Sequence, residues 1–182
     1  MRRKGFVSVL AAVAVAGSAV TAGTVAAAAS TPQAGGKVHL TAYADSDEAG
    51  ATVIVTGVIG DFGEGMSVTG QGVLTAEHNQ YMKLALSQGS FQIGLASLDK
   101  KFISKFTRVF PTSRKTCSGA VSVTGAAPIR AGSGTGAYRR ITGGFDLTIT
   151  VDEVDVKAKC SPDSALLYEE IVITGPGTVS LG

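Results

Sequence analysis

The sequence of 182 residues contains no tryptophan and only two histidines, and these shortages weaken the case for several kinds of site. Without tryptophan, and with aromatic residues at 6% of the chain, carbohydrate binding on aromatic platforms has little support. A hydrolase triad needs a base beside a nucleophile. No G-x-S-x-G motif is present, and His39 and His78 fall on a polar strand face and in a predicted turn. We therefore interpret both histidines as solvated or hydrogen-bonded residues.

Charge is also scarce, at 16% of the residues. Three of the sixteen basic residues are Arg2, Arg3 and Lys4, so the chain from Ser30 onward carries 13 basic and 14 acidic residues and a net charge of −1. Nucleic-acid binding needs clustered Lys and Arg to neutralise phosphates. A nearly neutral chain gives no electrostatic case for it, and we expect no nucleic-acid partner.

The first thirty residues have the features of an export signal. The basic residues are followed by a stretch without charge from Phe6 to Val25, and then by four alanines at positions 26–29. Signal peptidases recognise this order of positive charge, apolar core and small residues. The sequence therefore predicts a signal peptide over residues 1–29, cleaved after Ala29 or one residue earlier, and a secreted, extracellular protein.

Two alternatives to this route remain open. The apolar stretch is long enough to cross a bilayer as an uncleaved anchor, although its Ala, Gly, Ser and Thr residues gain little apolar area. The pair Arg2-Arg3 is a partial twin-arginine signal. A lipid-modified N-terminal cysteine is excluded, because no cysteine lies near the cleavage region. After cleavage we expect no stable membrane anchor.

The two cysteines, Cys117 and Cys160, predict a disulfide, because disulfides persist in exported domains. A metal site would want His or carboxylate neighbours at matching spacing, and neither histidine is close in sequence to either thiol. Free buried thiols are the alternative. Each cysteine shares an apolar strand face with two valines, Cys117 with Val121 and Val123 and Cys160 with Val154 and Val156.

From Gly36 onward the apolar residues recur with a period of two, which is typical of strands with one buried face. The clearest strand runs from Phe145 to Val151, where apolar and polar residues alternate. At Asp152-Glu153 the apolar phase slips by one residue to Val154 and Val156, which predicts a β-bulge. Other strands are expected around Val38, Met66, Met82, Phe91, Val121 and Ile171, with the last strands broken at residues 175–177.

One segment has helical spacing instead. Leu98, Phe102 and Phe106 recur every four residues, and Ser97 is placed to cap the N-terminus of a short helix. Strand after strand, with one short helix and glycine-rich turns, favours a single all-β domain, an antiparallel barrel or sandwich. We place this domain at residues 37–182, after a flexible lead-in at residues 30–36.

The glycine-rich segment Gly132–Gly144 leads directly into the Phe145 strand. It resembles the turn-and-strand signature of the allene oxide cyclase and dirigent barrel superfamily, in which a glycine-rich turn, an aromatic residue and a later glycine precede an alternating strand. Residues Thr56–Gly63 are similar to an early strand and turn of small secreted bacterial members. The resemblance implies a single antiparallel eight-stranded β-barrel, often oligomeric, with an apolar cavity.

The resemblance also implies two kinds of chemistry. Plant cyclases of that superfamily guide a reactive lipid epoxide with a Glu, an Asn and an ordered water, and dirigent proteins steer radical coupling with charged cavity residues. The only asparagine of this chain, Asn79, lies in a predicted connection rather than in a strand. No catalytic residue can therefore be carried over to this sequence.

The same glycines have a reading that does not depend on the resemblance. Residues 132–137 match G-x-G-x-x-A, which mimics a dinucleotide fingerprint, but that motif requires a helix after the turn and a strand follows here. Glycines permit a positive φ and close backbone approach. We interpret this segment as a structural turn built on Gly132, Gly134, Gly136 and Gly143.

Four residues are candidates for ligand binding at a barrel mouth. Asp61 and Glu64 lie in one glycine-rich turn, and Tyr138 and Arg140 follow the other. An arginine beside an aromatic residue can hold a carboxylate or a phosphate. The alternative for Asp61 and Glu64 is an acidic turn without function. The alternative for Tyr138 and Arg140 is a polar surface that only keeps the protein soluble.

The acidic clusters give only weak metal signals. Residues 45–50 begin like a calcium loop, but Ala49 and Thr56 occupy ligand positions of that motif. Asp152, Glu153 and Asp155 at the predicted bulge are the second candidate, although carboxylates at a strand end are more often solvated. We expect no metal and no cofactor.

Together these features predict a secreted, disulfide-bonded β-barrel protein without catalysis that binds a small apolar ligand or a partner. The alternative is a cyclase- or dirigent-like catalyst acting on an apolar reactive intermediate in the barrel cavity. Catalysis by excluding water and fixing a conformation leaves no motif in a sequence. A homo-oligomer is a further expectation, and an apolar patch on the outer wall would mark an assembly subunit.

We expect the secreted protein to begin at Ser30, or at Ala29 if the peptidase cuts one residue earlier, because the small residues end there. Amino-terminal sequencing of protein from culture supernatant checks this. A chain that keeps Met1 and stays in the membrane fraction would identify the uncleaved anchor instead.

Overall fold

The computed structural model describes residues 35–45, 50–69, 80–157, 160 and 164–182. Several sequence predictions lie outside the described residues: the signal peptide at residues 1–29, most of the lead-in, most of the calcium-like loop, His78 and Asn79. The architecture below is that of the described residues.

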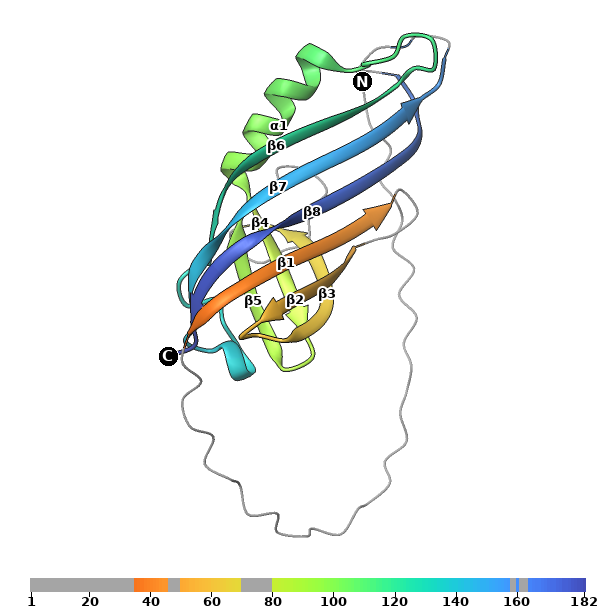
Figure 1. The fold of residues 1–182 in the computed structure, drawn as a ribbon. Helices are drawn as coiled ribbons and strands as arrows, with labels where there is room; N and C mark the ends of the chain where they lie inside the picture. Colours follow the sequence, from red (N-terminus) through yellow and green to blue (C-terminus); the bar gives the residue numbers. More distant parts are fainter. Residues whose placement is uncertain (1–34, 46–49, 70–79, 158–159, 161–163) are drawn as a thin grey trace, which may run out of the picture. The chain divides into compact units, whose positions relative to one another are not determined.

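Eight strands form one antiparallel sheet that curls into a half-barrel (Figure 1). Their order is β5-β4-β3-β2-β1-β8-β7-β6, so the last strand in sequence lies between the first and the seventh. This confirms the predicted all-β class with one helix. The strands are β1 (Gly36–Asp45), β2 (Ala51–Gly57), β3 (Asp61–Val68), β4 (Tyr81–Leu86), β5 (Gly89–Gly94), β6 (Ser118–Pro128), β7 (Thr142–Asp155) and β8 (Leu166–Ser180).

The two edges of the sheet meet near one end of the curled sheet. An isolated antiparallel bridge joins Ile93 of β5 to Ile129, directly after β6. The chain then follows β5, and the backbone N–H of Arg130 donates to the backbone O of Gln92 at 2.8 Å. This run ends in the 3-10 turn η1 (Gly136–Tyr138). Residues 129–138 therefore close this end of the barrel.

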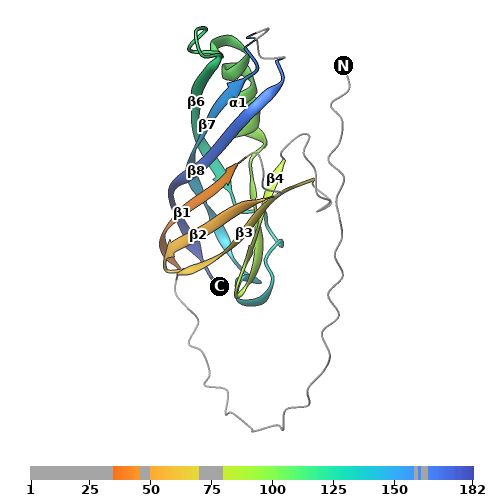
Figure 2. The same ribbon diagram turned by 90° about the vertical axis from the view of Figure 1, so that its right-hand side faces the viewer.

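The helix α1 (Ala96–Val109) lies along β6 (Figure 2). Leu98 buries its side chain in the core. The Nζ atoms of Lys101 and Lys105 donate to the backbone O of Thr124 at 3.2 Å and of Ser122 at 2.8 Å. Both carbonyls belong to β6, the edge strand of the sheet. Lysines that cover a strand edge hinder pairing with another chain.

Apolar side chains fill the inner side of the sheet. Along β1, for example, Val38, Leu40 and Ala42 point inward, and His39 and Thr41 are exposed between them. Strands with one buried face produce this alternation. The largest side chains with no exposed surface are Phe91, Leu40, Leu84, Ile93, Leu98 and Leu147.

The start of α1 differs from the prediction. The N-cap residue is Leu95, no side chain caps the helix, and Ser97 is an exposed residue of the first turn. Leu95 and Leu98 are both buried, so packing of these two residues rather than capping chemistry determines where the helix begins. Phe106 stacks on Phe110 with ring centroids 4.5 Å apart.

The predicted phase slip in β7 is wrong. Residues Val151 and Asp155 are buried, with 4% and 1% of their surface exposed, whereas Val154 is 37% exposed. The odd-numbered face therefore stays inward to the end of the strand. The register shift lies between Val154 and Asp155, two residues later than expected. The valines suggested a core face, but at this end the chain turns carboxylates inward instead.

The strand β8 is continuous through Gly175-Pro176-Gly177, where the sequence predicted a break. Pro176 is exposed and pairs with His39, so the ladder with β1 continues past it. The ladder with β7 is interrupted opposite, at Asp146 and Leu147. Proline removes a donor from only one ladder, and the strand persists because its other neighbour holds it.

The predicted disulfide between Cys117 and Cys160 is present, with the two Cα atoms 5.1 Å apart. The expected strand faces do not account for it: Cys117 directly precedes β6, and Cys160 lies beyond the end of β7. The bridge ties the start of β6 to the chain after β7 across a separation of 43 residues. Closing a loop of this length contributes about 4 kcal/mol on the chain-entropy model.

The glycine-rich turn yields a stability prediction. A Cβ at Gly134 would overlap the backbone O of Tyr138, and Gly136 combines a φ of 57° with an overlap onto the backbone O of Gln88. Gly134→Val and Gly136→Val should each lower the free energy of unfolding by at least about 1–3 kcal/mol, as measured by urea melts.

Two variants serve as controls for this turn. Gly132 has a φ of 72° but nothing lies within 4 Å of a Cβ placed there. Gly132→Val should therefore lower the free energy of unfolding by less than Gly134→Val or Gly136→Val. Arg140 is exposed, and Arg140→Gln should change stability by less than about 0.5 kcal/mol. Unchanged melts for Gly134→Val and Gly136→Val would show that the turn is neither tight nor strained.

Candidate functional site

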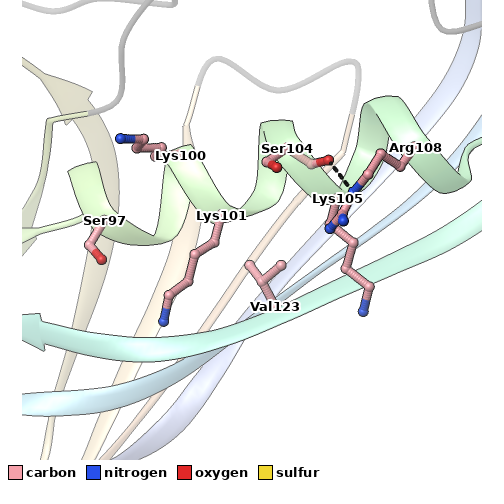
Figure 3. Close-up of a pocket in the computed structure, with 7 residues that line it drawn as sticks. All are labelled: Ser97, Lys100, Lys101, Ser104, Lys105, Arg108 and Val123. Carbon is pink, nitrogen blue, oxygen red and sulfur yellow. Dashed lines mark hydrogen bonds between the residues drawn. The ribbon is translucent and has the colours of Figure 1, made fainter.

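A groove of about 540 Å³ lies between α1 and β6 (Figure 3). Residues three, four and seven positions apart share one face of a helix, and that spacing gathers basic and hydroxyl side chains on the groove side of α1. The strand contributes one apolar residue. The groove is lined by Ser97, Lys100, Lys101, Ser104, Lys105, Arg108 and Val123.

The cationic groups lie along the groove and retain free donors. Figure 3 shows Lys101 and Lys105 extending toward β6 on either side of Val123, whereas Lys100 extends away from the strand. Each of the two inward ammonium groups donates to one carbonyl of β6 and has two further protons to donate. The Nε atom of Arg108 donates to the backbone O of Ser104 at 3.1 Å, which leaves its terminal NH₂ groups available.

The positive charge of this groove is not compensated within the part of the chain that the structure describes. There, none of Lys100, Lys101, Lys105 and Arg108 forms an ion pair with a carboxylate. Four cations in one groove attract anions, and a guanidinium can bind a carboxylate or phosphate with two parallel hydrogen bonds. The arrangement therefore suits an acidic group of a ligand or partner.

Two of the predicted ligand residues, Asp61 and Tyr138, contact each other inside the closed end. The Oη atom of Tyr138 donates to Asp61 at 2.5 Å, and the Oγ atom of Ser87 donates at 2.6 Å. The backbone N–H groups of Phe62 and Gln88 donate to the same carboxylate at 2.8 and 3.1 Å. Asp61 is 4% and Tyr138 is 2% exposed. This network joins β3, the β4–β5 turn and η1.

Burial and hydrogen bonding have opposite effects on the pKa of Asp61. Desolvation raises the pKa of Asp61, but the hydrogen bonds from Ser87, Tyr138, Phe62 and Gln88 outweigh it and lower the pKa to about 2. Burial, followed by the bond to the Asp61 carboxylate, raises the pKa of Tyr138 well above its ordinary range. At neutral pH the pair is thus an ionised carboxylate held by a neutral phenol.

The other two predicted ligand residues lie elsewhere. Glu64 is exposed on the outer face of β3, and Arg140 is exposed after η1, as is Arg139. Adjacent strand residues point to opposite faces, which explains why Glu64 does not join Asp61, three residues earlier. The structure therefore brings together only Asp61 and Tyr138 of the four, and it uses them inside the fold.

The second metal candidate divides between two faces of β7. Asp152 is exposed on the outer face, while Glu153 and Asp155 turn inward. Among the described residues, no three His, Cys, Asp or Glu side chains are arranged to hold a metal ion. Glu153 and Asp155 instead form a carboxylate pair, which we consider separately below.

The outer wall carries several exposed apolar side chains. Ile54 and Phe62 face each other across β2 and β3 and are 50% and 67% exposed. Leu166, Leu167 and Tyr168 form a second exposed group at the start of β8. In the described parts of the chain, no helix has the length and apolar character needed to cross a membrane.

The basic groove is not among the sites predicted from the sequence, although the sequence contains a signal for it. Residues 97–115 hold six Lys or Arg residues and one acidic residue, Asp99, in a chain that is close to neutral after its first thirty residues. The net charge of the whole chain hid this local excess, and the helical pattern drew attention to the apolar face of the same segment. A charge count in a sliding window would have found it.

Comparisons with known proteins give no family assignment: no family model, no curated protein and no solved structure matches this chain.

The Asp61 network predicts a loss of stability in acid. The folded-state pKa of Asp61 lies below its ordinary value of 3.8. The contribution of this network to the free energy of unfolding is therefore complete above about pH 4 and is lost as the pH falls toward 2. Tyr138→Phe should lower the free energy of unfolding at neutral pH by about 1–3 kcal/mol, because one donor to a buried carboxylate disappears.

The checks for this prediction are urea melts at neutral and acidic pH. Tyr81→Phe is the matched control, since Tyr81 uses its ring face to contact Arg130 and should tolerate loss of its hydroxyl. In Tyr138→Phe the acid transition should begin at higher pH than in the parent. Equal melts for the two phenylalanine variants would show that the bond to Asp61 contributes nothing.

Proposed function

We propose that this protein is an exported, non-catalytic interaction module that binds acidic groups of a partner in the groove between α1 and β6. The observation that carries the proposal is the lining of that groove. Its basic side chains Lys101, Lys105 and Arg108, with Lys100 at the rim, have no carboxylate partner in the described chain.

The packing of the interior supports binding at the surface rather than inside the barrel. Inward-facing residues such as Leu40, Leu84, Phe91 and Ile93 have no exposed surface and pack in one continuous core. A site for a small apolar ligand needs a cavity of a few hundred Å³, and these side chains occupy the space where it would lie. Of the two ligand types expected from the sequence, a partner is therefore favoured.

The burial of Asp61 and Tyr138 supports a role without catalysis. Polar side chains that act on a substrate must reach it, whereas Asp61 and Tyr138 are buried and hydrogen-bonded to each other at the closed end. Membership of the allene oxide cyclase and dirigent superfamily stays a prediction that rests on the resemblance of residues 132–144 and 56–63.

The disulfide and the N-terminal sequence support an extracellular location. Disulfides persist in oxidising compartments, and the bridge between Cys117 and Cys160 joins the ends of two neighbouring strands. The charge pattern of residues 2–29 predicts export. Outside the cell, acidic groups of surface polymers and proteins are the partners that a basic groove would meet.

The exposure of the groove determines what kind of binding to expect. Exposed cations are screened by salt over about 8–10 Å, and an exposed ion pair contributes at most about 1 kcal/mol. Several such contacts together give a moderate affinity that falls as salt rises. Arg108 can add a bidentate contact to a phosphate or carboxylate.

The test is a titration of the secreted protein with inorganic pyrophosphate and with citrate, followed by amide chemical shifts of α1 at low salt. Both anions should shift α1 and β6 resonances, and salt should weaken the effect. Lys101→Gln combined with Arg108→Gln should weaken binding about tenfold, as expected for two lost charge contacts.

A matched double variant controls for net charge. Arg114→Gln with Lys115→Gln removes the same charge from the exposed loop after α1, and it should leave the affinity within about twofold. Thermal melts show whether either variant has lost the fold. Equal weakening by both doubles, or shifts spread evenly over the surface, would contradict a site in this groove.

A further inference from the structure

Three carboxylates gather on the inner face where β7 and β8 meet the disulfide. Glu153 of β7 lies directly opposite Glu169 of β8, and Asp155 is the next inward residue along β7. Like charges placed opposite each other on neighbouring strands destabilise a sheet. Glu153 and Asp155, two residues apart on this inner face, therefore repel each other unless one of the two carboxyl groups is neutral.

Asp155 is the most constrained member of this cluster. Its side chain is 1% exposed, and neither carboxylate oxygen has a hydrogen-bond partner. Its backbone N–H is committed to the backbone O of Cys117 at 2.9 Å, so the residue is held where it lies. Burial of an ionised carboxylate without a donor is strongly unfavourable. The missing donor has to come from a neighbouring group.

Among the residues that the structure describes, the surroundings supply no basic side chain for this purpose. The β6 segment beside it, Ser118–Pro128, has no ionisable side chain, and β8 presents only Glu169 on the inner face, with Tyr168 and Glu170 on the outer. The nearby cations in sequence, Arg114, Lys115 and Lys157, are exposed. Among the described residues, the side chain placed to donate to Asp155 is that of Glu153, in its protonated form.

We propose that Glu153 and Asp155 form a proton-binding site, in which one proton shared by the two carboxyl groups holds the end of the β7–β8 pair closed. The protonated Glu153 donates to the buried Asp155 carboxylate, so the pair carries one negative charge instead of two. When that proton leaves, Glu153 and Asp155 become two adjacent anions on the inner face, and their mutual repulsion opens this end of the sheet. The site goes beyond the partner binding proposed for the groove and does not depend on it.

The direction of the Glu153 titration agrees with this geometry. Desolvation, then the neighbouring carboxyl group of Asp155, and then that of Glu169 raise the pKa of Glu153 from 4.5 to about 8. A carboxyl group whose pKa is raised in the folded state stabilises that state most at low pH. For Glu153 this contribution to the free energy of unfolding is complete below about pH 4.5 and is lost as the pH rises through about 8. Two interacting carboxyl groups titrate as a pair.

The consequence is a stability that falls as the pH rises from about 4.5 to about 8. The parent protein should melt at a temperature several degrees lower at about pH 8.5 than at about pH 5.5, on the order of 4 °C or more for a domain of this size. The loss should be local, with the amide of Asp155 exchanging faster at the higher pH. That amide reports the bond to Cys117 directly.

Two variants isolate the pair. Glu153→Gln places a permanent neutral donor beside Asp155, so its melting temperature should be nearly independent of pH over this range and higher than that of the parent in alkali. Asp155→Asn removes the buried charge and should also make the melting temperature nearly independent of pH. Asp152→Asn, on the exposed outer face of the same strand, is the matched control and should keep the profile of the parent.

Three outcomes would overturn the proposal. The first is a melting temperature of the parent that does not change between about pH 5.5 and 8.5. The second is a pH dependence that Glu153→Gln and Asp155→Asn both retain. The third is a gain in melting temperature on adding millimolar calcium chloride at about pH 8.5 that disappears in Glu153→Gln, because a cation rather than a proton would then fill the site. These outcomes do not depend on whether pyrophosphate binds the groove.

Discussion

An open sheet of eight strands has two edges, and the satisfaction of those edges is the constraint on which the rest of this molecule depends. At one end β5 pairs through Ile93 and Gln92 with the chain that follows β6, which closes the barrel. Along the rest of β6, α1 supplies lysine donors to the strand carbonyls. Unpaired edges invite association with other chains. The edge cover and the basic groove share residues, because Lys101 and Lys105 both donate to β6 carbonyls and line the groove.

The sequence predicts the parts of this fold in which local pattern and burial agree. The alternation from Phe145 to Val151 identifies β7 correctly, and the glycine-rich segment before it is a turn, because a strand rather than a helix follows. The disulfide also follows from the sequence, which contains only two cysteines. These features depend on residues that are close in sequence or on a single pairing.

Prediction fails where tertiary contacts reverse the local preference. Val154 and Val156 suggested a core face, but the interior at that end accommodates Asp155 and a shared proton would offset the cost. Pro176 suggested a break, but β1 holds the strand on its other side. The basic groove escaped notice because its charges are spread along one helix face and become a site only beside β6. The sequence predicts Asp61 and Tyr138 as ligand residues. Their hydrogen bond to each other cannot be predicted from the sequence, because the two residues are 77 positions apart.

The central position of β8 in the sheet has a consequence for how the chain folds during its synthesis. This strand of 15 residues comes after the other seven in the sequence but lies between β1 and β7, and its Val179 pairs with Gly36 of β1. Until β8 leaves the ribosome, β1 to β5 and β6 with β7 can form only two separate sheets. Contacts of such long sequence separation form late and slow folding. Formation of the eight-stranded sheet is therefore tied to synthesis of β8, and a premature stop before residue 166 would leave two sheets with unpaired edges.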